Sequence, residues 1–338
     1  MKLVRLSLLA AAGLSLLLLS SCGRASSGSP GAQDPPPKMA AILPGMIGDQ
    51  SWNKTNYDGI LKCREDLGVD LEYMENVAES DFEAVLTSYA QQGYGLVIAA
   101  GSQFDEAVAA VAPDYPETTF CVVNGSYCGG KNVAPVFPKE YEASYLASII
   151  AGNVTQSGTL GVIAGYPNTP MEHLLDVYEK NAVGLAAGRG IPNPRALRCY
   201  ANSWTDVELG RKIAEQMIDS GADTLFIYAN QVGLGCIEAA KERHVKVIGF
   251  SDNQNDLGEG TVIASINFDF ATLYSWTVQQ YLSGELRGNR IHEIGIREGL
   301  FVPTYPTGTP QALKDAVDQG ISDFLDGKAD LTQWFAED

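Results

Sequence analysis

The alternation of apolar and polar positions along the chain predicts short buried strands separated by amphipathic helices. Leu96–Ala100 is apolar throughout, and Thr224–Tyr228 is nearly so, as expected of strands that are covered on both faces of a parallel sheet. Between such runs, apolar residues recur at helical spacing, as do Phe82, Leu86 and Tyr89. This alternation is typical of α/β proteins, in which helices pack on both faces of a mostly parallel sheet.

The middle of the chain contains two similar α/β units of the same length. Residues 93–100 and 221–228 each end one helix and begin a strand, and each is followed by a helix and a second strand. The second strands run up to Asn124 and Asp252. Two similar units indicate two similar lobes, and two lobes that face each other form a cleft in which a ligand can bind.

The same pattern places strands and helices along the rest of the chain. The predicted strands lie at residues 39–43, 96–100, 120–123, 160–164, 195–200, 224–228, 245–250, 261–266 and 293–297. The predicted helices include one that begins near Ser51 and others at 140–153, 171–187, 206–220, 235–243, 271–283 and 310–325.

We therefore predict a two-lobed α/β fold, in which each lobe is a parallel sheet flanked by helices. Lobe 1 is expected to comprise residues 39–137 plus about 268–286. Lobe 2 is expected to comprise residues 138–267 plus about 287–338. The crossover segments would act as a hinge, about which the lobes close around a ligand as rigid bodies.

The N-terminus has the pattern of a bacterial export signal. In residues 1–21, basic side chains precede an apolar stretch that is shorter than the roughly 20 residues needed to span a bilayer. The stretch ends in Leu-Ser-Ser-Cys22, which resembles a lipobox, so we expect Cys22 to be lipidated and the chain to be cut before it. An ordinary cleaved signal with an incidental cysteine is the alternative. Residues 22–38, rich in Gly, Ser and Pro, are expected to form a flexible tether.

Charge and cysteine content exclude several classes of function. The formal net charge of −18 would repel nucleic acid and anionic lipid, so neither is expected as a ligand. Beyond Cys22 an odd number of cysteines follows at irregular spacing, which argues against a disulfide framework. Cys121 and Cys128 could form a bridge, or they could be free thiols. The three histidines have no partners at metal-ligand spacing, so no metal site is expected.

Polar and aromatic residues stand directly after the predicted strands. Because ligands of open α/β sheets bind beyond the carboxyl ends of the strands, these residues are the candidates for a binding site. They are Asp49, Trp52, Asn53, Gly101, Ser102, Asn124, Tyr166, Asn202, Trp204, Asn230, Gln231, Asp252 and Asn267.

Two tryptophans on polar turns predict a slot for a planar ligand. Trp52 and Trp204 each stand beside Asn and Ser at the start of a helix, one in each lobe. A tryptophan in such a turn can instead cover the edge of a core. A planar ligand between two such rings gains roughly 1–3 kcal/mol per stacked ring. Asp252 could accept hydrogen bonds from two neighbouring hydroxyls, so a heteroaromatic base that carries a sugar would satisfy the whole set.

Several short motifs resemble those of the basic membrane protein (PnrA-like) family of substrate-binding lipoproteins. They stand at residues 49–53, 101–104, 142–147, 204–206, 221–223 and 249–254, and the similarity extends from about Met39 to past Asn267. The resemblance implies a type I periplasmic-binding-protein fold and uptake of nucleosides, especially purine nucleosides, by an ABC transporter.

The resemblance also implies roles for individual residues. The stacking aromatics of the family match Trp52 and Trp204. The residues that read the base edge match Asp49 and Asn53. The positions that contact ribose match Ser102, Asn124, Asp252 and Asn267, together with backbone near Gly233.

The chain departs from the family pattern at two ribose positions. Asn124 stands where the family usually has Asp, and Asn267 stands where it usually has Lys. The loss of one acid and one base together preserves the net charge. Because Asn both donates and accepts hydrogen bonds, hydroxyl binding could survive the change.

The leading hypothesis is a lipid-anchored, extracytoplasmic solute-binding protein that binds a nucleoside, in particular a purine nucleoside, for an ABC permease and its ATPase. A free nucleobase, a modified nucleoside or a sugar as ligand, and a role as a ligand sensor, are alternatives. An enzyme is not expected, because the sequence has no metal-binding aspartate cluster, nucleophile–base pair or phosphate loop. We expect no cofactor, no nucleic acid partner, contact with the membrane only through the lipid anchor, and a monomer.

Overall fold

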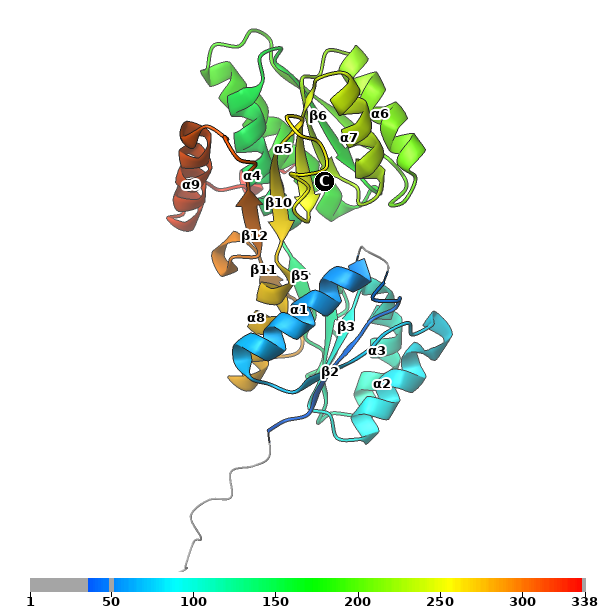
Figure 1. The fold of residues 1–338 in the computed structure, drawn as a ribbon. Helices are drawn as coiled ribbons and strands as arrows, with labels where there is room; N and C mark the ends of the chain where they lie inside the picture. The colour runs from blue at the N-terminus through cyan, green and yellow to red at the C-terminus, as the bar shows by residue number, and fades with distance from the viewer. Residues whose placement is uncertain (1–35, 49–51, 336–338) are drawn as a thin grey trace, which may run out of the picture. The chain divides into compact units, whose positions relative to one another are not determined.

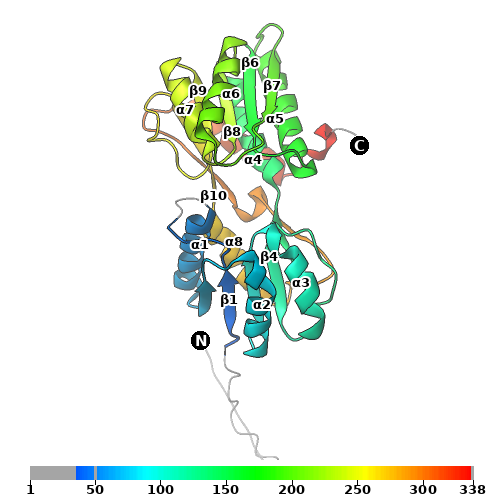
Figure 2. The ribbon, with the colours of Figure 1, turned by 90° about the vertical axis from the view of Figure 1, so that its right-hand side faces the viewer.

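The computed structural model describes residues 36–48 and 52–335, and residues 37–338 belong to one compact unit. The expected export signal, Cys22 and nearly all of the expected tether lie outside the described residues, as does Asp49. Figures 1 and 2 show two sheets, each with helices on both of its faces. The two-sheet α/β architecture predicted from the sequence is thereby confirmed.

The first sheet has six parallel strands in the order β11-β5-β4-β3-β1-β2. Alternate residues of a strand point to opposite faces, so Leu96 and Ile98 of β3 pack with α1 and α8, whereas Val97 and Ala99 pack with α2 and α3. Its elements are β1 (Met39–Ile42), α1 (Trp52–Leu67), β2 (Leu71–Met74), α2 (Phe82–Gln91), β3 (Leu96–Ala100), α3 (Asp105–Val111), β4 (Thr119–Val123), β5 (Val136–Pro138), α8 (Phe270–Leu282) and β11 (His292–Ile294).

The second sheet also has six strands, in the order β12-β10-β9-β8-β6-β7. Phe226 and Tyr228 of β8 pack on the face that α4 and α5 cover, whereas Leu225 and Ile227 pack with α6 and α7. Its elements are α4 (Glu140–Val154), β6 (Thr159–Ala164), α5 (Thr169–Gly188), β7 (Arg195–Tyr200), α6 (Val207–Asp219), β8 (Thr224–Tyr228), α7 (Val232–Glu242), β9 (Lys246–Ser251), β10 (Val262–Phe268), β12 (Phe301–Thr304) and α9 (Gln311–Leu325).

The chain passes between the two sheets at three places. It leaves the first sheet after β5 and enters α4, returns between β10 and α8, and leaves again between β11 and β12. The last passage contains the short 3₁₀ helix Ile296–Glu298. Glu142 of α4 holds this passage, because its carboxylate accepts a hydrogen bond from the backbone N–H of Ile296 at 2.6 Å and pairs with Lys139 at 2.6 Å.

The structure differs from the predicted lobes in two respects. We expected the chain to join lobe 2 from about residue 287. Because β11 pairs with β5 of the first sheet, the chain instead passes to the second sheet only after β11. The second sheet is not wholly parallel, because β12 pairs with β10 in the antiparallel direction. The strands β2, β5 and β12 were not predicted from the sequence.

Candidate functional site

Trp52 is fixed at the carboxyl edge of the first sheet. It is the first residue of α1, and its indole N–H donates a hydrogen bond to the carbonyl oxygen of Ala100, the last residue of β3, at 3.0 Å. Its ring meets the ring of Phe270 edge-on, with a centroid distance of 5.3 Å and an interplanar angle of 86°. These contacts hold the half-buried indole in one orientation beside the strand ends, as a rigid wall of a binding site requires.

Asn53 holds the turn that follows the first strand. Its side-chain oxygen accepts a hydrogen bond from the backbone N–H of Gly45 at 3.0 Å. A Cβ atom at Gly45 would lie 2.4 Å from the Asn53 amide nitrogen, so a larger residue there would displace the Asn53 side chain. Asn53, which the family resemblance assigned to the base edge, therefore has a structural role in this turn as well. Asp49, its expected companion, lies outside the described residues.

Ser102 and Asn124 also stand at the carboxyl edge of the first sheet. Ser102 is exposed and begins the turn after β3. Asn124 follows β4, with its backbone N–H donating to the carbonyl oxygen of Val136 at 2.9 Å and with a left-handed φ of 61°. The Asn124 side-chain oxygen is buried and has no hydrogen-bond partner among the described residues. Because a buried acceptor without a partner is costly, this atom marks the place where a donor is needed.

Trp204 lies at the carboxyl edge of the second sheet. Its carbonyl oxygen accepts a hydrogen bond from the N–H of Gln231 at 2.9 Å, which joins the turns that follow β7 and β8. Its ring lies so close to Gly165 that a Cβ atom there would be 2.2 Å from the indole. The exposed ring of Tyr166 is 5.8 Å from the ring of Trp204. Tyr166 stood among the strand-end residues but was not assigned a binding role; its pairing with Trp204 depends on the tertiary structure.

Asp252 and Asn267 line one pocket at the same edge. Asp252 directly follows β9, and Asn267 lies in β10, where it is opposite Ser251 in register. The Asn267 side-chain oxygen accepts a weak hydrogen bond from the Thr304 hydroxyl at 3.4 Å, and Asp252 is exposed. The pocket has a volume of about 520 Å³, and Thr55 and Asp58 of α1 also line it. Elements of both sheets therefore contribute to this pocket.

Gly233 is less suited to its predicted role. It lies in the first turn of α7, where its backbone N–H donates to the carbonyl oxygen of Asn230 at 3.0 Å. A Cβ atom at this position would be 3.2 Å from the side chain of Ile227. The residue is buried, and its N–H is already used within the turn.

The predicted residues thus form two groups at the carboxyl edges of the two sheets. Within the described residues, the ring of Trp52 contacts Phe270 and the ring of Trp204 contacts Tyr166, and the two indoles make no ring contact with each other. The first group is Trp52, Asn53, Ser102 and Asn124, and the second is Trp204, Gly233, Asp252 and Asn267.

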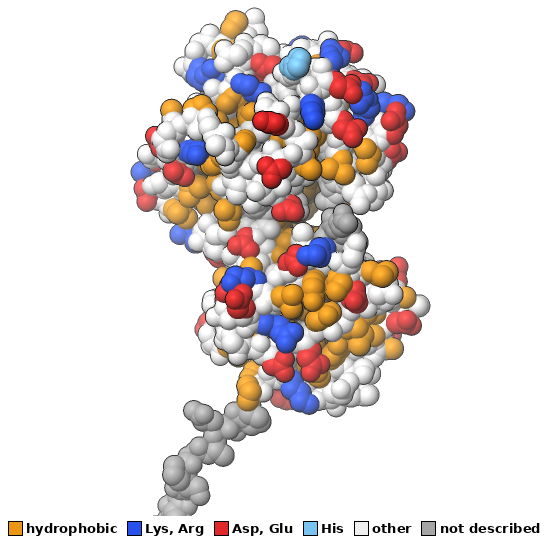
Figure 3. Space-filling view, viewed as in Figure 1, with side chains coloured by type: hydrophobic (Ala, Val, Ile, Leu, Met, Phe, Trp, Pro, Cys, Tyr) orange, Lys and Arg blue, Asp and Glu red, His pale blue; other side chains and the backbone are white. Residues whose placement is uncertain are grey.

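Charged side chains of both signs are distributed over the visible surface (Figure 3), and the cysteines of the described residues are free thiols. Figure 3 shows acidic and basic side chains scattered over the visible face, without a continuous basic patch. The described residues contain no group of three or more His, Cys, Asp or Glu that could hold a metal ion. Cys121 and Cys128 are free thiols, and burial raises the pKa of the Cys121 thiol to about 12. No helix in the described part of the chain is long and apolar enough to span a membrane.

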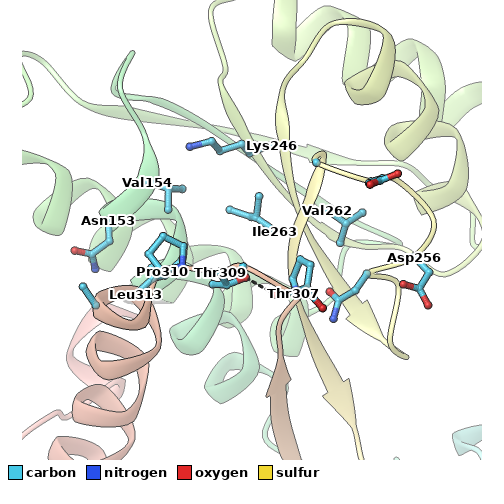
Figure 4. Close-up of a pocket in the computed structure, with 16 residues that line it drawn as sticks. Asn153, Val154, Lys246, Asp256, Val262, Ile263, Thr307, Thr309, Pro310 and Leu313 are labelled. Carbon is cyan, nitrogen blue, oxygen red and sulfur yellow. Dashed lines mark hydrogen bonds between the residues drawn. The ribbon is translucent and has the colours of Figure 1, made fainter.

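A larger pocket, of about 780 Å³, lies at the opposite end of the second sheet (Figure 4). Lys246 and Val262 stand at the amino ends of β9 and β10, and Val154 and Leu313 come from the end of α4 and the start of α9. None of the residues predicted from the strand ends lines this pocket. The chemistry of the strand-end residues, rather than the size of the hollow, therefore identifies the candidate site.

Comparison with known proteins shows what the chain resembles. Residues 37–304 match the model of a family described as ABC transporter substrate-binding protein PnrA-like. The chain is 26% identical to the ABC transporter nucleoside-binding protein BmpA of Lactococcus lactis, over 93% of this chain and 94% of that protein. It is 25% identical to the transcriptional activator protein med of Bacillus subtilis, over 81% of this chain and 82% of that protein. A solved ABC transporter solute-binding protein from Aeropyrum pernix has the same fold, with a TM-score of 0.68 and 22% identity, over 87% of this chain and 92% of that one.

Proposed function

Since the chain belongs to the PnrA-like family of ABC transporter substrate-binding proteins, we propose that it binds a nucleoside, with a purine base preferred, and presents it for uptake. As a member of this family the chain is a solute-binding protein and not an enzyme, as predicted. The partners of such a protein are a small-molecule ligand and a permease with its ATPase. The nucleoside, the purine preference and the lipid anchor at Cys22 are parts of the proposal.

The buried side-chain oxygen of Asn124 is the observation that carries the nucleoside assignment. It stands at the carboxyl edge of the first sheet, where the family places a ribose contact, and lacks a partner among the described residues. A ribose hydroxyl can donate to this oxygen. Asn124 thereby keeps the acceptor of the family's aspartate without its charge.

The aromatic and polar groups around the site suit the other half of a nucleoside. Trp52 and Trp204 offer rings from the two lobes for a planar base, and Tyr166 extends the second wall. Asp252 is exposed beside Asn267 and has acceptors for two neighbouring hydroxyls. The relative from Lactococcus lactis, named as a nucleoside-binding protein, supports this choice over a sugar.

A regulatory role through DNA is the less favoured alternative. The relative from Bacillus subtilis is named as a transcriptional activator. The net charge of −18 on the present chain would repel a DNA backbone, so a direct role in DNA binding is disfavoured. A sensor that passes its ligand-bound form to a protein partner would use the same ligand site, and the genes beside this one would distinguish it from a transporter component.

We expect purine nucleosides to raise the melting temperature of the chain from Gly23 onward, which includes the whole compact unit. A ligand at about 100 times its dissociation constant adds about 2.7 kcal/mol to the free energy of unfolding. Thermal shift and calorimetry should be run with purine and pyrimidine nucleosides, their free bases, hexoses and pentoses. A response to sugars alone, or to none of these by folded protein free of co-purified ligand, would contradict the nucleoside assignment.

Asn124→Ala is expected to weaken nucleoside binding about three- to tenfold and to leave free-base binding unchanged, because one hydrogen bond to ribose is lost. Asn193→Ala is the matched control. Asn193 also has a left-handed backbone, with φ of 48°, but it is exposed and precedes β7 at the other end of the second sheet. Both variants carry similar backbone strain, so equal losses of nucleoside affinity would show that Asn124 acts through stability alone.

A further inference from the structure

A chain of hydrogen bonds ends on Asn267, which lines the pocket at the carboxyl edge of the second sheet. It begins at the backbone N–H of Gln254, which donates to the Ser265 hydroxyl at 3.0 Å. The Ser265 hydroxyl donates to the side-chain oxygen of Asn255 at 3.0 Å. The Asn255 amide nitrogen donates to the Thr304 hydroxyl at 3.3 Å, and this hydroxyl donates to the side-chain oxygen of Asn267 at 3.4 Å.

The direction of this chain is fixed at its first member. A backbone N–H can only donate, so the Ser265 hydroxyl accepts there and uses its own hydrogen for Asn255. The side-chain oxygen of Asn255 is thereby occupied, and its amide nitrogen faces Thr304. The Thr304 hydroxyl accepts from this nitrogen, which leaves its single hydrogen for Asn267. Each group thus determines the orientation of the next one.

Burial makes the chain costly to rearrange. Ser265 is fully buried and Asn255 is 8% exposed, so a polar atom that lost its partner here would not regain one from water. The carbonyl oxygen of Ser265 also lies 3.4 Å from the Thr304 hydroxyl and shares its hydrogen. Within the described residues, Thr304 is the side chain that forms a hydrogen bond with the Asn267 amide.

The oxygen of Asn267 is engaged by Thr304, so its amide nitrogen, with two N–H donors, is left for a ligand. Asn267 is half-buried, and the exposed carboxylate of Asp252 lines the same pocket. One ribose hydroxyl can donate to this carboxylate and accept from an N–H at the same time. On the first sheet, Asn124 instead offers a buried oxygen that accepts. The two asparagines therefore present opposite groups.

We propose that Thr304 is a positioning residue, which orients the Asn267 amide so that it donates a hydrogen bond to a ribose hydroxyl oxygen of the bound nucleoside. The inference rests on the proposed function and adds the direction of one ligand contact. Thr304 does not itself line the described pocket, so it acts through Asn267. The site selects a ligand with an acceptor at this point and disfavours one that presents only a donor.

Replacements of similar shape at Asn267 test the direction of the contact. Calorimetry with adenosine should compare the wild type with N267L and N267D. We expect N267L to bind about three- to tenfold more weakly, because one hydrogen bond is lost. N267D should bind more weakly still, since two carboxylates would then face a hydroxyl that has one hydrogen to donate. An N267D variant that binds adenosine as tightly as the wild type would overturn the proposed direction.

Thr304→Val tests the positioning role, because it removes the hydroxyl and frees the Asn267 amide to turn. We expect about a two- to fivefold loss of affinity for adenosine, and T304S should restore it. The same titration with 2′-deoxy-, 3′-deoxy- and 5′-deoxyadenosine identifies the hydroxyl. The loss should disappear for the one analogue that lacks the contacted hydroxyl, whereas a purely structural role would weaken all four ligands alike.

T261V is the matched control for T304V. Thr261 is also buried beside β10, but it directly precedes this strand at the amino edge of the sheet, and its hydroxyl takes no part in the described chain. T261V should leave the affinity for adenosine unchanged. Melting temperatures of both variants show that they are folded.

The outcomes separate this inference from the nucleoside assignment. A T304V variant that keeps the wild-type affinity, or that loses affinity equally for all four ligands, would overturn the role of Thr304 while the nucleoside assignment stands. A wild type that binds no nucleoside would overturn the nucleoside assignment and this inference with it.

Discussion

Replacing Trp204 by alanine is expected to weaken nucleoside binding by at least about tenfold, because the loss of one stacked ring removes roughly 1–3 kcal/mol. A hydrogen bond from the backbone N–H of Gln231 fixes the Trp204 backbone, and close contact with Gly165 restricts its indole. It therefore meets the base as a rigid surface, and little conformational entropy is lost on binding. Titration calorimetry with a purine nucleoside measures the effect directly.

Two further variants sharpen this test. Gly165→Ala keeps the indole but displaces it, since the added Cβ would lie 2.2 Å from the ring, and an intermediate loss of affinity is expected. Trp276→Ala is the matched control: this half-buried tryptophan of α8 packs near His292, with ring centroids 6.3 Å apart, and not at a strand end. It should lower stability without changing affinity. Unchanged affinity in Trp204→Ala would exclude stacking between two indoles.

Gly235→Ala is expected to destabilise the protein by about 3 kcal/mol, at the upper end of the cost of overpacking a well-packed contact. A Cβ atom at Gly235 would lie 1.8 Å from the carbonyl oxygen of Val207. The same close approach occurs from the other helix, because a Cβ atom at Gly210 would lie 2.0 Å from the carbonyl oxygen of Val232. The backbones of α6 and α7 therefore approach each other directly, and an added methyl group must push the two helices apart.

Thermal unfolding of Gly235→Ala measures this cost, and Gly184→Ala is its matched control. Gly184 lies in α5, and a Cβ atom there would have no described neighbour within 4 Å beyond its own helix backbone. Alanine at this position should therefore be neutral or stabilise the helix by up to about 1 kcal/mol. The turn before α7 carries Gln231, which holds Trp204, so Gly235→Ala should also weaken ligand binding. Equal melting temperatures for the two variants would contradict the backbone contact.

The sequence predicted the regular elements well where they are long and buried. The predicted limits of Leu96–Ala100 and Thr224–Tyr228 agree with the structure, because a short apolar run between helices has few alternatives to a buried parallel strand. The polar residues after the strands were predicted as site candidates because ligands of parallel sheets bind beyond the carboxyl ends of the strands. Motif resemblance added the family, which the match over residues 37–304 confirms.

Weakly patterned or isolated elements could not be placed from the sequence. The strand β2 is an edge strand with a partly exposed pattern, and β12 contains Pro303 and pairs in the antiparallel direction. The position of β11 in the first sheet follows from its hydrogen bonds to β5, and no local pattern in residues 292–294 reports a partner so distant in the chain.

The sequence by itself determined the α/β class, the two similar units, the family and the residue types that stand at the strand ends. Only the tertiary structure decided what those side chains do. It showed that Asn53 binds Gly45 and that the Asn124 oxygen is buried without a partner in the described part of the chain. The reason is physical: periodicity records which face of an element is buried, whereas hydrogen bonds and desolvation depend on groups that the fold brings together from distant parts of the chain.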